Sequence, residues 1–124
     1  MKWHSLLYAN INRQSLFVLM NIEVQALQKE IDSVRSRLVR ANKEVSNIIH
    51  QIKSVHNIRE EAQASLNDTG LTLLEANSKN AAIDACRHSQ MDLELYLSDK
   101  KVFCERLELH HKRLLKKLAA LFTQ

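Results

Sequence analysis

The most constraining feature of this sequence is a heptad pattern of apolar residues between Leu27 and Val55. Apolar side chains recur there at alternating steps of three and four residues, at Leu27, Ile31, Val34, Leu38, Ala41, Val45, Ile48, Ile52 and Val55. The same frame extends from Phe17 to Ala76, and of its 18 positions only Arg59 and Thr69 are polar. A pattern sustained over this many heptads is typical of a coiled coil. It predicts an all-α fold, an elongated coiled coil.

The composition agrees with this prediction. The chain of 124 residues has no proline, a single glycine (Gly70) and only six aromatic residues. Few residues can therefore interrupt a helix, and a compact core would have to be built from aliphatic side chains alone.

A second apolar frame follows the first, displaced by three residues. Its apolar members are Ile83, Cys86, Leu93, Leu97, Cys104, Leu107, Leu114, Leu118 and Leu121. Four polar residues interrupt it: Lys79, Gln90, Lys100 and His111. The change of frame is a stammer-like discontinuity, and it divides the pattern into two arms.

Turn and capping residues lie between the two arms. Asn67 and Asp68 favour turns, Gly70 suits a left-handed position after a helix, and Thr72 with Glu75 has capping-box spacing. We therefore predict a first helix over residues 17–66, a turn over 67–72 and a second helix over 73–122, forming an antiparallel helical hairpin broken near Asn67–Thr72. The alternative is one uninterrupted long helix, because the first frame crosses Gly70 without a slip.

Residues 1–16 do not fit the main frame, so we expect a separate N-terminal apolar segment there. Its apolar side chains are Trp3, Leu6, Leu7, Tyr8 and Ile11. They could cap the bundle, or Trp3 could anchor the chain on a partner, since tryptophan supplies a large contact area at interfaces.

The residue types along the first frame favour a non-identical partner. Valine and isoleucine at its d positions suit a parallel two-stranded zipper poorly, and the flanking charges show no regular code for self-pairing. The partner is either the chain's own second arm or another helical protein. The predicted partner-binding seam is Leu27, Ile31, Val34, Leu38, Val45, Ile48, Ile52 and Val55. Arg59 either meets an acidic group and fixes the register, or extends past the seam into water.

The whole net charge of +4 lies in the last 16 residues. Residues 1–108 balance, whereas residues 109–124 contain four cations and no acid: Lys112, Arg113, Lys116 and Lys117. These cations could complement the dipole at a helix C-terminus or contact an acidic protein surface. A membrane or nucleic acid is a less favoured partner. For nucleic acid the patch is small and has no nearby aromatic residue except Phe122.

No pattern of catalytic or metal-binding residues stands out. Cys104, Glu108 and His111 share a helical face, but two are imperfect core positions beside a surface acid, and a fourth metal ligand is missing. We expect no enzyme activity, no cofactor, no small-molecule substrate and no metal site. Ser15–Met20 is too short for a secretory signal, and no apolar run reaches membrane-spanning length. We expect an intracellular protein, cytoplasmic or cytoskeletal, that is neither secreted nor transmembrane.

These patterns predict a non-enzymatic coiled-coil structural or scaffold subunit that assembles with other helical proteins, for example in a cytoskeletal or ciliary complex. That setting follows from where small coiled-coil proteins often occur, not from particular residues. One alternative is a helical-bundle component in membrane trafficking or tethering, and another is a nucleic-acid-associated subunit.

Overall fold

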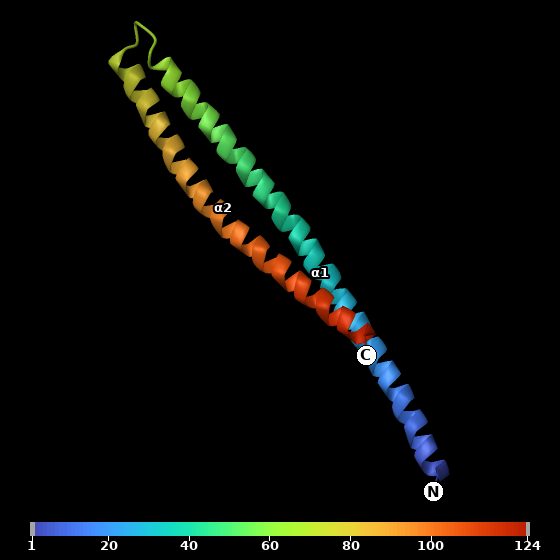
Figure 1. The fold of residues 1–124 in the computed structure, drawn as a ribbon. Coiled ribbons are helices and arrows are strands. Elements are labelled where there is room, and N and C mark those ends of the chain that lie inside the picture. The colour runs from blue at the N-terminus through green and yellow to red at the C-terminus, as the bar shows by residue number, and fades with distance from the viewer. Residues whose placement is uncertain (1, 124) are drawn as a thin grey trace. The chain divides into compact units, whose positions relative to one another are not determined.

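The chain forms two helices joined by a short connection (Figure 1). The computed structural model describes the backbone of residues 2–123 and the side chains of residues 14–123. Helix α1 spans Lys2–Ser65 and helix α2 spans Leu73–Phe122. Helices make up 93% of the described residues, which include no strand. The predicted all-α class is confirmed, and the alternative of one uninterrupted helix is wrong because the chain leaves the helical conformation after Ser65.

The connection over residues 66–72 contains the predicted turn and cap. Gly70 has a φ of 97°, a conformation that L side chains rarely adopt, so this position favours glycine. It lies in the middle of the connection rather than directly after α1. The backbone N–H of Glu75 donates to the Thr72 hydroxyl at 3.2 Å, so Thr72 caps the start of α2.

Helix α1 begins earlier than the sequence indicated. The segment over residues 1–16 was expected to be separate from the first helix, but α1 already includes Lys2. The segment contains no proline or glycine, so nothing in it ends a helix. The side chain of Trp3, the candidate anchor, lies outside the described residues.

The chain divides into two compact units. One, here called the terminal unit, combines Met1–Leu38 with Arg106–Gln124, and the other, the turn unit, comprises Val39–Glu105. In the turn unit, α1 and α2 leave the connection as antiparallel neighbours (Figure 1). The terminal unit pairs the first part of α1 with the last part of α2.

Each unit has a small apolar core on the faces marked by the two sequence frames. The buried residues of the terminal unit are Ile31, Val34, Leu107 and Leu114. Those of the turn unit are Ala41, Ile48, Ile83 and Cys104. All eight belong to one of the two frames, so the heptad pattern correctly marks the faces that α1 and α2 bury.

Candidate partner-binding surfaces

The predicted partner-binding seam is covered within the chain. Among its members Ile31, Val34 and Ile48 are buried, and the remaining five are half-buried: Leu27, Leu38, Val45, Ile52 and Val55. Residues of α2 approach it in both units, since Leu27 lines a groove together with Leu121, and Val55 lines a depression together with Leu93. In the closed hairpin, another protein would therefore have to contact other surfaces.

The covered part of the first frame starts at Val24 rather than at Phe17. Phe17 is 71% exposed and Met20 is also exposed, whereas Val24 is half-buried. The reason is the end of α2 at Phe122, since Leu121 is its last frame residue and lies near Met20 and Glu23. N-terminal to Glu23, Leu121 is the only described residue of α2 that lines a groove with α1.

This uncovered part of α1 carries a cluster of large exposed apolar side chains, which we call the apolar end. Its members are Leu16, Phe17, Val18, Leu19, Met20 and Ile22. Five of them are consecutive, and at 100° per residue they surround the helix rather than forming one stripe. The run of five apolar residues over 16–20 is visible in the sequence. The heptad frame includes only Phe17 and Met20 of this run, so the frame alone did not indicate an apolar surface on all sides of the helix.

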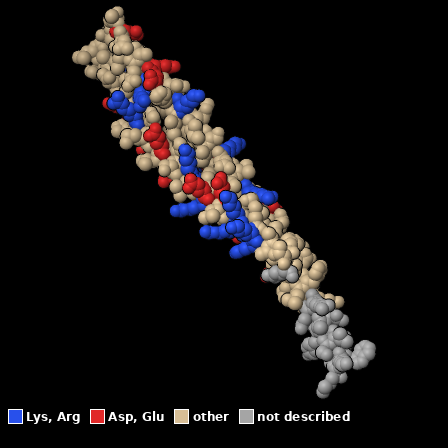
Figure 2. Space-filling model, in the orientation of Figure 1, with Lys and Arg blue, Asp and Glu red and all other residues tan. Residues whose placement is uncertain are grey.

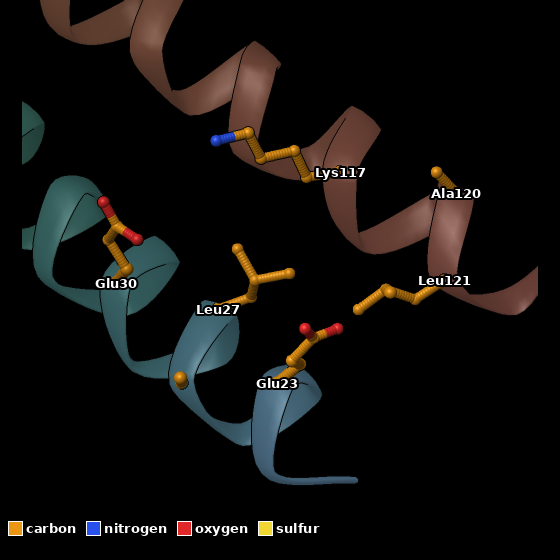
Figure 3. Close-up of a pocket in the computed structure, with 7 residues that line it drawn as sticks. Glu23, Leu27, Glu30, Lys117, Ala120 and Leu121 are labelled. Atoms are coloured by element: carbon orange, nitrogen blue, oxygen red, sulfur yellow. The ribbon is translucent and has the colours of Figure 1, made fainter. Parts of the chain in front are cut away.

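Two grooves adjoin the apolar end inside the terminal unit. One, of about 350 Å³, is lined by Leu16, Leu19, Met20, Glu23 and Leu121. The second, of about 410 Å³, has apolar walls from Ala26, Leu27, Ala120 and Leu121 and charged edges from Glu23, Glu30 and Lys117. Figure 3 shows the Leu27 and Leu121 side chains pointing into the space between the two helices. The two grooves share Glu23 and Leu121, and the first also contains Leu16, Leu19 and Met20 of the apolar end, so the three regions adjoin.

The four predicted acidic-surface contacts lie in the same unit. Lys112, Arg113, Lys116 and Lys117 are all exposed, and none of them forms an ion pair with another described residue. The terminal unit as a whole contains ten Lys and Arg against four Asp and Glu, a net charge of +6, while the turn unit has eight against ten. Blue and red side chains mix over much of the surface, and the lower described part is tan (Figure 2).

Three of the four polar residues that interrupt the second frame make polar contacts with α1. Lys79 Nζ donates to the Ser65 carbonyl oxygen at 3.4 Å, which helps to cap the end of α1. Lys100 Nζ lies 2.6 Å from Glu44 Oε2, and His111 Nε2 accepts a hydrogen bond from Arg35 Nε at 3.1 Å. Three of the interruptions therefore make cross-helix polar contacts, which the sequence frame alone did not reveal.

Of these three residues, Lys100 has the largest number of recorded interactions. Its ammonium also lies 5.8 Å from the centroid of the Tyr96 ring and 5.3 Å from that of Phe103. The hydrogen bond to Glu44 raises the pKa of Lys100 above its ordinary value of 10.5, although burial acts in the opposite direction. The ion pair with Glu44 and the two aromatic rings thus stabilise the charged Lys100 side chain at a position of the second apolar frame.

In the terminal unit, His110 and His111 of α2 make the polar contacts with α1. His110 Nε2 lies 3.5 Å from Glu30 Oε1, next to the contact between His111 and Arg35. Arg35 can act only as a donor, so in this hydrogen bond His111 Nε2 is the acceptor.

Arg59, the candidate register residue, is half-buried in the turn unit. One of its guanidinium nitrogens lies 3.3 Å from His56 Nδ1, while its Nε is buried without a hydrogen-bond partner among the described residues. The side chain of Gln90 likewise has a buried Oε1 without a partner there. Arg59 therefore lies within the hairpin rather than entirely in water, and the described contacts include no carboxylate facing it.

No cluster of metal-ligating side chains occurs among the described residues. Cys86 and Cys104 are free thiols, and residues 14–123 contain no group of three or more His, Cys, Asp or Glu side chains able to hold a metal ion. Neither helix, over its described length, has a stretch long and apolar enough to cross a membrane.

Comparison with known proteins does not assign this chain to a family. No family model, no curated protein and no solved structure matches it.

Proposed function

We propose that this protein is a non-enzymatic structural subunit that assembles with other helical proteins. The observation that carries the proposal is the balance of apolar surface over the described residues. Eight apolar residues are buried, whereas nineteen large apolar side chains are exposed. Contiguous exposed apolar surface commonly marks a site of protein interaction. Further helices packed on α1 and α2 would remove this surface from water and add to a small core.

Within this proposal, α1 and α2 pack on each other as an antiparallel coiled coil. The heptad spacing of both frames and the burial of their members support this geometry. The hairpin would then be one element of a larger helical bundle. The proposed setting of this bundle is a cytoskeletal or ciliary assembly.

The native mass of the protein tests this function. The isolated chain has a mass of 14.3 kDa. We expect it to elute from size-exclusion chromatography of a native extract in a complex with other proteins, and cross-linking mass spectrometry should map its contacts to helical segments of those proteins. Elution at the mass of the isolated chain at its cellular concentration would contradict the proposal.

A membrane-tethering function is a second candidate, because a basic surface and the apolar end occur in one unit. Cations near exposed apolar side chains can bind an anionic membrane surface. Co-sedimentation with phosphatidylserine vesicles, using the chain with and without residues 109–124, distinguishes the two functions. Binding that depends on those residues favours tethering, and a lack of sedimentation removes it.

A further inference from the structure

We propose that the apolar end of α1 is the docking site for an acidic amphipathic helix of a partner protein. This inference rests on the proposed assembly function and adds to it a location and a partner chemistry. The partner helix would lie along α1 where α2 no longer covers it, and its end would approach Leu121.

Continuity with the interface between α1 and α2 is the first argument. Phe17 and Met20 occupy the same heptad frame as the buried Ile31 and Val34, so this face of α1 has the spacing that accepts a helix. The groove of about 350 Å³ links the two regions, since Leu121 lines it together with Leu16 and Met20. A helix packed there would extend an interface that the protein already makes.

Charge complementarity selects the partner. The terminal unit has a net charge of +6: Glu23 lines both grooves, but residues 1–22 contain Lys2 and Arg13 and no acid, and Lys117 lines the second groove. A second copy that used the same end would bring two such surfaces together, which is unfavourable. A helix with carboxylates beside its apolar stripe would instead pair with Lys116, Lys117 and their basic neighbours.

The distribution of the apolar side chains favours a helical protein over a membrane. A helix lying on a bilayer needs one apolar face and one polar face. Residues 16–20 are apolar on all sides of α1, so a flat surface would leave some of them in water. The acidic partner helix would cover the side of Phe17 and Met20, and further helices of the assembly would cover the other sides.

A photo-cross-linking experiment on the full chain tests the proposal directly. A benzophenone amino acid replaces Phe17 in cells that express the protein, and the cross-linked peptides are identified by mass spectrometry. We expect peptides from a helical segment with acidic residues beside an apolar heptad stripe. The same probe at Val39 is the control, because Val39 has comparable exposure (67%) but polar residues at the neighbouring helix positions Arg35, Ser36, Asn42 and Lys43.

Two pairs of variants supply the quantitative test. Leu16→Glu should lower the fraction of the chain found in its native complex by about tenfold or more, because Leu16 is a groove residue and the new charge repels an acidic helix. Val39→Glu should change that fraction less than about twofold, as a surface change away from an interface does. Lys117→Glu should cause a smaller loss than Leu16→Glu, and Lys101→Glu, also an exposed lysine of α2, should cause none. Circular dichroism of each variant checks that the helices persist.

The outcomes separate this inference from the proposed function. An intact complex with Leu16→Glu, or cross-links from Phe17 to a second copy, to lipid or to nucleic acid, would overturn the docking site and leave the assembly function standing. A wild-type chain that forms no complex would overturn both. Loss of the complex with Leu16→Glu alone, together with cross-links to an acidic helix, supports the docking site.

Discussion

The terminal unit and the turn unit bury equal numbers of apolar residues over the described part of the chain, but their surfaces differ. Among residues 14–123, whose side chains the structure describes, each unit has four buried core residues. The terminal unit is basic and carries the apolar end, whereas the turn unit is slightly acidic, with a charge of −2. The comparison shows that similar cores in one hairpin can carry different binding properties, because recognition depends on the surface that the core leaves uncovered.

The polar contacts between the helices differ as well. A lysine–glutamate pair joins α1 and α2 in the turn unit, whereas two histidines make these contacts in the terminal unit. The first contact joins two side chains of opposite charge at 2.6 Å, whereas in the second Arg35 Nε donates a hydrogen bond to His111 Nε2 at 3.1 Å.

The largest expected effect comes from placing a charge in the core of the turn unit. Ile48 is 3% exposed, so Ile48→Asp should lower the free energy of unfolding by about 4 kcal/mol or more and abolish assembly. Ile49, the next residue, is 48% exposed, and Ile49→Asp should cost less than about 1 kcal/mol. Urea unfolding followed by circular dichroism measures both values. Equal losses for the two variants would show that this face of α1 is not the packed one.

Truncation of one core residue in each unit should have the next largest effect. Leu114→Ala in the terminal unit and Ile83→Ala in the turn unit should each cost about 2–5 kcal/mol, because both side chains are buried. Hydrogen exchange should show faster exchange within the unit that holds the substitution. If Leu114→Ala instead accelerates exchange equally throughout residues 39–105, the two units unfold as one and the comparison between them fails.

The smallest expected effect concerns the ion pair of the turn unit. The folded-state pKa of Lys100 is raised by Glu44, so the pair stabilises the fold below pH 10.5 and this contribution is lost as the pH rises through the folded pKa. The stability advantage of the wild type over Lys100→Met should therefore be constant between pH 7 and 9 and shrink above 10.5. Lys101→Met, on an exposed neighbour, is the control. An advantage that persists at pH 12 would contradict a contribution from this ion pair.

The sequence predicted the helical class, the two helices, the position of the break and the buried faces. Those features follow from local signals: heptad spacing, Asn67, Gly70 and the Thr72 cap. The pairing of Lys100 with Glu44 could not be read in this way, because it depends on the axial offset of the helices, which the connection and the packing set together. The exposure of Phe17 and Met20, at the start of the first frame, was missed for the same reason, since it depends on where Phe122 falls along α1.

The order of contacts along the chain bears on how the hairpin folds. The contact between Ser65 and Lys79 closes a loop of 14 residues, whereas that between Arg35 and His111 closes one of 76. In a flexible chain the longer closure costs about 1.5 kcal/mol more in entropy. Pairing that begins beside the connection and advances toward the termini avoids most of this cost, because each formed contact shortens the next loop. The apolar end would then lie at the last part of the chain to become ordered, where a partner could bind during the final step of folding.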